Sequence, residues 1–221
     1  MLLNTFFYYA TAQESPGRNI LLAGCGVSIP YGEFSWKTFN SGGEFATVGP
    51  GLDVEIMHFT RSFFGFSARV GYSSIFFGEK AYRSEYERIL GTDGEVTVSA
   101  GNYQFLSGMA GFLARMPEFL DTRIILQVQT GYVLCVHPDL VVDHAYWGRL
   151  NTVKQVSDGQ LMSSAGIIVT HALSEKYGIS LSYTVNAAKP GFSDPMPDGS
   201  YYYFYIPVRY QNIQAGMTIT F

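Results

Sequence analysis

The chain has 221 residues, of which 14% are charged, 47% are hydrophobic and 16% are aromatic, with a net charge of −4. The hydrophobic content is too high for an intrinsically disordered chain, and the 14 Lys and Arg residues form no cluster that would bind nucleic acid. No stretch has the roughly 18–20 consecutive apolar residues that a membrane-spanning helix needs.

Residues 1–12 (MLLNTFFYYATA) form a short apolar run that ends in Ala10-Thr11-Ala12. A small-x-small ending after an apolar run of this length is typical of a secretory signal peptide. The run lacks a positively charged start, so we predict a truncated signal peptide at residues 1–12 and a single domain at residues 13–221. An apolar arm that packs on the domain is the alternative.

Further along the chain, segments alternate between apolar and small polar residues at residues 20–29, 52–58, 64–76, 106–116, 124–136, 161–173, 177–186 and 212–221. Successive side chains of a β-strand point to opposite faces, so each segment predicts a strand with one apolar face. No apolar face holds Asp, Glu, Lys or Arg, whereas the opposite faces hold Asp53, Glu55, Arg69 and Arg115. Because a basic side chain facing hydrocarbon costs about 2–4 kcal/mol, the apolar faces are predicted to face lipid.

The connections between these segments alternate between short and long. The short ones are residues 59–63, 117–123 and 174–176, and the long ones are residues 30–48, 77–102, 137–160 and 187–206. Short periplasmic turns and long extracellular loops are the layout of outer-membrane barrels. We therefore predict an all-β fold, an eight-stranded antiparallel up-and-down transmembrane β-barrel in the outer membrane of a Gram-negative bacterium. The charged run at residues 79–88 is consistent with a short solvated helix in one loop.

A soluble lipocalin-like barrel would show the same alternation, with its apolar face turned inward around a ligand. Here the polar face is mostly Gly, Ser, Thr, Asn and Gln, which are small enough to fill a narrow lumen. Tyr and Phe also gather near the ends of the predicted strands, as in interfacial girdles. Both observations favour the membrane barrel.

The last segment carries the most specific signature, a terminal aromatic residue preceded by apolar residues at every second position: Ile213, Ala215, Met217, Ile219 and Phe221. With this signature the chain resembles the small outer-membrane β-barrel family of the eight-stranded OmpA/OmpX-like type. The resemblance implies that outer-membrane lipid surrounds the barrel. It also implies that the barrel-assembly machinery recognises the last strand by pairing with it.

Three charged residues are predicted to meet inside the barrel. If Ile56 pairs with Phe66, then Asp53 lies opposite Arg69, and Glu55 lies opposite Ser67. The interior of an eight-stranded barrel is just wide enough for side chains. We therefore interpret Asp53, Glu55 and Arg69 as a structural ion-pair cluster that plugs the lumen, and a narrow gated channel is the alternative.

Candidates for chemistry fall in or near the third long connection, and they are His137, Asp139, Asp143, His144, Ser157 and Ser163. A lipid-modifying barrel enzyme would need a Ser or His pair near one rim, and a divalent metal would need clustered ligands. The spacing here matches neither arrangement. We therefore predict no enzymatic activity, no catalytic residues, no cofactor and no metal site, and a lipid-modifying enzyme is the alternative.

Aromatic residues also fall in the predicted extracellular loops, namely Trp36, Phe39, Tyr146, Trp147, Tyr201, Tyr202 and Tyr203. Aromatic side chains at loop tips are common binding anchors. The sequence thus predicts a non-enzymatic barrel with a structural or binding role. That role is exerted either through these loops or as the membrane partner of another protein in an envelope complex.

Overall fold

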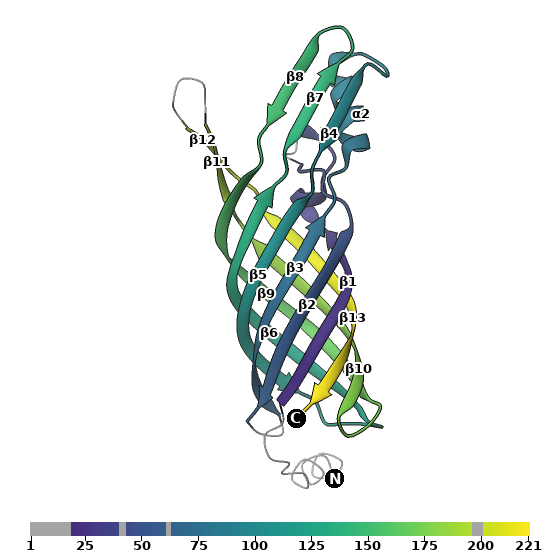
Figure 1. The fold of residues 1–221 in the computed structure, drawn as a ribbon, viewed down its shortest axis with the longest axis vertical. Coiled ribbons are helices and arrows are strands. Elements are labelled where there is room, and N and C mark those ends of the chain that lie inside the picture. The colour runs from purple at the N-terminus through teal and green to yellow at the C-terminus, as the bar shows by residue number, and fades with distance from the viewer. Residues whose placement is uncertain (1–18, 40–42, 61–62, 196–200) are drawn as a thin grey trace, which may run out of the picture.

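The computed structural model describes residues 19–39, 43–60, 63–195 and 201–221, so the predicted signal peptide lies outside the described residues. Eight antiparallel strands close into a barrel (Figure 1), as the sequence predicted. They are β1 (Asn19–Pro30), β2 (Gly49–Phe59), β3 (Phe64–Ile75), β5 (Tyr103–Arg115), β6 (Thr122–His137), β9 (Val156–Ala172), β10 (Tyr177–Ala188) and β13 (Val208–Thr220). Pairing of β1 with β13 closes the barrel, so none of these strands has a free edge.

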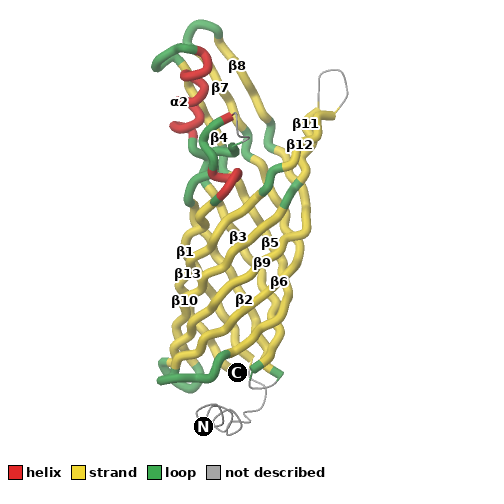
Figure 2. Tube along the Cα trace, turned by 180° about the vertical axis from the view of Figure 1, so that it is seen from behind, coloured by secondary structure: helices red, strands yellow, loops and turns green. Residues whose placement is uncertain are grey.

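The two ends of the barrel differ in their connections, as Figure 2 shows. At one end the connections are short, and the chain enters at Asn19 and ends at Phe221, whose backbones exchange hydrogen bonds of 3.1 and 3.0 Å. At the other end the long connections fold into additional strands and helices. The short end is the periplasmic end in this layout, and the long connections form the extracellular side.

The outward face of the wall is a belt of exposed apolar side chains. Leu181 is 57% exposed, Phe112 is 68% exposed and Met217 is 62% exposed. These residues alternate with inward-facing neighbours because successive side chains of a strand point to opposite sides. A continuous apolar belt around a closed barrel matches the hydrocarbon layer of a membrane.

Among the described residues, no helix is long and apolar enough to cross a membrane.

The barrel interior consists of three layers rather than the uniformly small polar filling that the sequence predicted. The periplasmic third is mainly apolar: beside the inward-facing Thr170 and Thr218 it contains Ile20, Leu22, Met57, Phe59, Leu113, Ile125 and Ile168. The middle third is a polar layer, which holds Asp53, Glu55, Ser67, Arg69, Gln127, Gln129, Ser164, Asn186 and Gln214. The extracellular third is again apolar and includes Ile75, Tyr103, Phe105, Met109, Val133, Cys135, Met162 and Tyr210.

The predicted register of β2 against β3 is wrong by two residues. Ile56 pairs with Ala68 rather than Phe66, so Glu55 lies opposite Arg69 and Asp53 lies opposite Gly71. A shift of two residues leaves every side chain on its predicted face, because the side-chain period of a strand is two. The three charged residues therefore still point into the lumen.

Above the barrel, the second and third long connections build an extracellular extension that the sequence predicted only as loops with one helix. It consists of a sheet in the order β4 (Val96–Ala100), β7 (Leu140–His144), β8 (Gly148–Val153), together with α2 (Glu79–Leu90). The helix confirms the expectation for residues 79–88. The buried residues of the extension are Phe45, Tyr82, Val96, Leu140 and Val142, so it has its own small core.

Two further segments complete the extracellular side. In the first long connection, the 3-10 helix η1 (Gly32–Ser35) places Phe34 in the mouth of the barrel, fully buried and 5.0 Å from the ring of Tyr103. In the last long connection, β11 (Gly191–Pro195) and β12 (Tyr201–Tyr205) form a separate two-stranded hairpin. The mouth is thus filled by aromatic side chains rather than open.

The turn between β5 and β6 is strained. Leu120 and Asp121 both have positive φ, 49° and 58°, and Phe119 and Thr122 bracket them with two backbone hydrogen bonds. This is the geometry of a two-residue hairpin turn that favours Asn-Gly, and a β-carbon in this conformation costs roughly 1–2 kcal/mol.

We expect Leu120→Asn to raise the free energy of unfolding by about 1 kcal/mol, because Asn tolerates positive φ and Leu120 is 75% exposed, so little packing is lost. Urea unfolding in lipid vesicles measures the change. Phe119→Asn is the matched control, since Phe119 is 74% exposed but has no positive φ, and it should bring no gain. An equal gain from both variants would contradict this explanation.

Candidate functional site

The polar layer joins charges from two strands. Arg69 on β3 lies with its Nη1 4.0 Å from Oδ2 of Asp53 on β2. Its Nη2 donates to Ser164 Oγ at 3.0 Å and to Asn186 Oδ1 at 3.4 Å, and it contacts Met109 Sδ at 3.2 Å. All three charged residues of the layer are nearly fully buried: Asp53 is 6% exposed, Glu55 is 2% and Arg69 is 5%.

Glutamine amides donate hydrogen bonds to both carboxylates. Gln129 Nε2 donates to Glu55 Oε1 and to Ser67 Oγ, both at 2.7 Å. In the amide orientation that satisfies both groups, Gln127 donates to Glu55 at 3.0 Å, and Gln214 donates to Asp53 at 2.7 Å. Buried charges persist only when such partners satisfy them, and here the glutamine amides, Ser67, Ser164 and Asn186 supply these partners.

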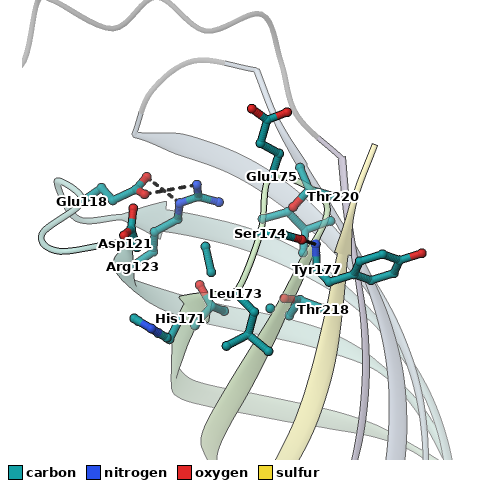
Figure 3. Close-up of a pocket in the computed structure, with 14 residues that line it drawn as sticks. Glu118, Asp121, Arg123, His171, Leu173, Ser174, Glu175, Tyr177, Thr218 and Thr220 are labelled. Atoms are coloured by element: carbon teal, nitrogen blue, oxygen red, sulfur yellow. Dashed lines mark hydrogen bonds and ion pairs between the residues drawn. The ribbon is translucent and has the colours of Figure 1, made fainter.

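A pocket of about 300 Å³ opens at the periplasmic end, between the β5–β6 and β9–β10 turns (Figure 3). Its guanidinium, Arg123, is neutralised by Glu118, with bonds of 2.7 and 3.3 Å. His171 contacts Thr122 at 3.1 Å, and Ser174 Oγ accepts a hydrogen bond from Tyr177 N, so neither activates the other. The hydroxyl of Ser174 and the imidazole of His171 therefore do not form the nucleophile–base pair that acyl transfer requires.

The structure does not bring the predicted catalytic candidates together. His137 sits at the barrel mouth, where its Nδ1 donates to Pro138 O at 2.9 Å and its Nε2 lies 3.8 Å from Glu44 Oε2. The rings of Tyr103, Phe192 and Phe204 surround it at centroid distances of 5.4, 5.7 and 5.8 Å. His137 is thus packed as part of the mouth, and the hydroxyl of its neighbour Tyr103 donates to Glu44 rather than to the imidazole.

The remaining candidates are dispersed over the extracellular side and the wall. Asp143 forms an ion pair with Arg149 at 3.0 Å, and the backbone carbonyl of Asp139 accepts from Gly101 N. Ser157 pairs with Val136 in the β6–β9 ladder, and Ser163 lies exposed on the outer wall opposite Thr130. Within the described residues, no group of three or more His, Cys, Asp or Glu side chains is placed to hold a metal ion.

The last of the six candidates, His144, braces the turn between β7 and β8. Its Nδ1 accepts backbone N–H groups from Tyr146 at 3.2 Å and Trp147 at 3.4 Å, so the ring proton lies on Nε2. Nε2 is 3.1 Å from Glu95 Oε2, and the contact is electrostatic rather than a well-aligned hydrogen bond. The indole of Trp147 stacks on the imidazole with centroids 4.1 Å apart and planes 11° apart.

The predicted loop aromatics have different environments. Tyr146 is 79% exposed, Trp147 is 61% and Trp36 is 43%. Phe39 instead packs in the extracellular extension against Phe45, Tyr82 and Tyr86, so it serves packing. Tyr203 on β12 is 68% exposed, and the side chains of Tyr201 and Tyr202 lie outside the described residues.

Sequence reasoning missed Glu95 and Phe34, which hold the β7–β8 turn and the barrel mouth in place. Glu95 precedes β4, and its carbonyl accepts Ala145 N at 2.9 Å, extending the β4–β7 pairing. The alternation of Val96 and Val98 with Thr97 and Ser99 was the available signal for this strand. Phe34 had no comparable signal, because burial of a loop residue depends on the mouth around it.

The extension is also tied to the first loop through α2. Two hydrogen bonds from Arg88, of 2.7 and 2.9 Å, hold the pKa of Glu85 below its ordinary value of 4.5, and a backbone N–H of Phe39 adds to this effect. A carboxyl with a lowered pKa in the folded state contributes stability above its unfolded pKa, and that contribution is lost as pH falls through the lowered value.

We therefore expect amide protection of α2, corrected for intrinsic exchange, to weaken as the pH falls below 4.5 and through the lowered pKa of Glu85. Hydrogen exchange followed by mass spectrometry measures this. Glu85→Gln should have the weaker protection above pH 4.5, approach the wild type below the lowered pKa, and lose the pH dependence. A wild-type and a Glu85→Gln profile with the same pH dependence would contradict the role of this carboxylate.

The C-terminal signature residues share one face of β13. Ile213, Met217 and Phe221 are 41%, 62% and 61% exposed on the belt side of the strand. Met217 pairs with Ala23 on β1 and with Ile179 on β10, so β13 is held on both sides. The signature therefore forms part of the belt and of the seam where the barrel closes.

No protein-family model matches this sequence, and no curated protein matches it. Solved structures do match. A major outer membrane protein from Thermus thermophilus superposes with a TM-score of 0.55 at 11% identity, over 94% of this chain and all of that one. The outer membrane protein AlkL, solved in lipid bilayers, superposes with a TM-score of 0.50 at 14% identity, over 96% of this chain and 93% of that one.

The attachment invasion locus protein Ail of Yersinia pestis also matches, with a TM-score of 0.49, 12% identity and coverage of 94% of this chain and 100% of that chain. The two matches with the higher scores show that the chain has the fold of the small outer-membrane barrels. Together with the lipid-facing belt, that fold places it in the outer membrane.

Proposed function

We propose that this protein is a non-enzymatic outer-membrane barrel that binds a partner through its extracellular extension. The observation that carries the proposal is that the extension has its own core and still leaves Tyr146 and Trp147 exposed at its end. Long loops without a function are expected to be irregular, whereas a binding site needs a rigid support. The barrel serves as the anchor, and the extension carries the contact.

The interior supports a closed barrel over a gated channel. The polar layer lies between two apolar layers, and Phe34 fills the mouth. An open water path would have to disrupt both apolar layers as well as the bonds of Arg69. Planar-bilayer recording of the wild type and of Asp53→Ala is expected to show no unitary conductance. A unitary conductance that changes in Asp53→Ala would favour the gated channel.

The dispersal of the catalytic candidates favours binding over lipid modification. His137 lies in the barrel mouth, His144 lies in the β7–β8 turn, and Ser163 faces the belt. Mass spectrometry of the lipids in cells that produce the wild type, His137→Ala or His144→Ala is expected to give the same profile. A lipid modification that disappears in either variant would favour the enzyme.

A shortened extension tests the proposed function directly. Leu140 pairs with Val153, so a two-residue Asn-Gly turn can replace residues 141–152 and keep the base of the sheet. The matched control replaces Leu120-Asp121 with Asn-Gly at the periplasmic end. Both variants and the wild type are reconstituted in lipid nanodiscs and incubated with solubilised cell envelope and with cell-surface polysaccharide.

We expect the wild type and the periplasmic control to retain the same protein or polysaccharide, and the shortened variant to retain less than about a tenth of it. Retention by all three would contradict the proposal and would assign the contact to the belt or to the periplasmic turns. A protein retained in this way would make the barrel the membrane partner of an envelope complex. The assembly machinery, in turn, is proposed to engage β13 during biogenesis, through the signature that ends at Phe221.

A further inference from the structure

The β7–β8 turn is the part of the extension that lies farthest from the C-terminus at the periplasmic side (Figure 1). Residues 145–147 connect His144 to Gly148, which has a φ of 71°. The next connection at this end of the sheet runs from α2 to β4, and the pairing of Ala145 with Glu95 brings the two connections side by side. We call these two connections together with the adjoining ends of β7 and β8, residues 91–95 and 143–149, the apex.

Trp147 is held rigidly at the apex. One face of its indole stacks on His144, which is 3% exposed, while the residue as a whole is 61% exposed. The two N–H bonds to His144 Nδ1 fix the backbone of the turn, and Glu95 flanks the other side of the imidazole. A side chain fixed before binding loses little conformational entropy when it binds.

Turn chemistry does not require these aromatic residues. Gly, Pro, Asn, Asp and Ser dominate turns, and the positive φ of this turn is supplied by Gly148. Tyr146 and Trp147 instead keep large apolar rings in water at the point most distant from the membrane, where no lipid girdle covers them. The open face of an indole is negative and attracts the C–H groups on the apolar face of a sugar ring.

The charges of the apex select among ligands. Asp143 and Arg149 neutralise each other at 3.0 Å, which leaves the carboxylates of Asp93 and Glu95 in excess. A negative apex repels sulfated or phosphorylated polysaccharides, nucleic acids and anionic membranes. It attracts neutral or amino sugars, because carboxylates accept hydrogen bonds from hydroxyl and ammonium groups.

The size of the apex favours a sugar over a protein as its ligand. A stable protein interface buries about 800 Å² on each partner, from roughly 20–30 residues. The two connections of the apex contain far fewer residues than that, and a single sugar ring needs only one aromatic face and a few polar groups. We propose that the apex binds a neutral or amino-substituted sugar ring of a cell-surface glycan, with Trp147 as the stacking platform. This proposal rests on the proposed function of the extension.

The chain contains only two Trp residues, which makes a selective optical test available. In Trp36→Phe, Trp147 is the only indole, and in Trp147→Phe, Trp36 is the only indole. Both variants, in nanodiscs, are titrated with lactose, maltotriose and chitotriose up to about 10 mM, a range that detects a Kd near 1 mM. A fluorescently labelled wild type is screened in parallel on a glycan array that carries neutral, amino, sialylated and sulfated members.

We expect a saturable change in emission with at least one sugar in Trp36→Phe and none in Trp147→Phe. On the array, Trp147→Leu should bind the same sugar at least about tenfold more weakly, because the stacking contact is lost. Neutral and amino members should bind more strongly than their sulfated counterparts. Heat modifiability on gels checks that each barrel is folded.

An empty array with unchanged emission in Trp36→Phe would overturn the sugar proposal. If the shortened extension still loses a retained protein in that case, the proposed function stands and its ligand is a protein. Preferential binding of sulfated members would also overturn the proposal, because the charge argument would then be wrong. If shortening the extension changes no retention at all, the proposed function and the sugar proposal fall together.

Discussion

Replacing Arg69 with methionine is expected to lower the free energy of unfolding of the barrel by about 3–5 kcal/mol. Asp53 and Glu55 would remain buried in the polar layer without a cation, at 6% and 2% exposure. Methionine keeps most of the length of the side chain, so the loss of stability comes from electrostatics and not from a cavity. Urea unfolding in lipid vesicles, followed by the mobility shift of folded barrels on gels, measures it.

Two variants test whether the charge is the cause. Arg209→Met removes an exposed arginine of the same type at the extracellular start of β13 and should cost less than about 0.5 kcal/mol. Asp53→Asn and Glu55→Gln combined with Arg69→Met remove all three charges and should recover most of the lost stability. If the triple variant is no more stable than Arg69→Met alone, the loss comes from packing and the ion-pair explanation fails.

Leu181→Arg is expected to cost about 2–4 kcal/mol in a lipid bilayer, because Leu181 lies in the belt on β10. The matched control is Ile89→Arg on α2. Leu181 is 57% exposed and Ile89 is 54% exposed, so in water the two substitutions would be equally harmless. Only the membrane distinguishes them. Equal stability of the two variants in vesicles would mean that the belt does not face hydrocarbon.

The strands and their faces were predictable because they depend on a local period. The register of β2 and β3 was not, since a shift from Ile56–Phe66 to Ile56–Ala68 preserves every inward and outward position. What selects between the two registers is the geometry of the β2–β3 connection and the packing inside the lumen. Neither is visible in the alternation of residues.

The layered interior and the extension depended on contacts between distant segments. Leu113 and Ile125 lie on the inward face that the sequence suggested to be polar, and their meeting at the periplasmic end requires the closed barrel. Val96 pairs with His144, although the two residues are distant in sequence. The alternation of β4 covers only five residues, and a pattern that short indicates a strand without excluding an irregular loop.

The candidate binding residues were partly predictable. Trp147 and Tyr146 stood out as aromatic residues in a long connection, and the structure leaves both exposed. Phe39 looked the same in the sequence but is packed in the extension. The difference arises from tertiary contacts of α2, which turn one loop aromatic inward and leave another at the apex.

The shared core of the extension limits how this surface can diverge between related strains. Loops usually accept insertions and substitutions independently of one another. Here Phe45 comes from the first connection, Tyr82 from the second and Leu140 from the third, and all three pack together. A length change in one of these connections therefore disturbs the other two, so diversification is expected as compensated sets of substitutions. The β11–β12 hairpin is tied to the barrel mouth instead, because its Phe192 and Phe204 pack on His137.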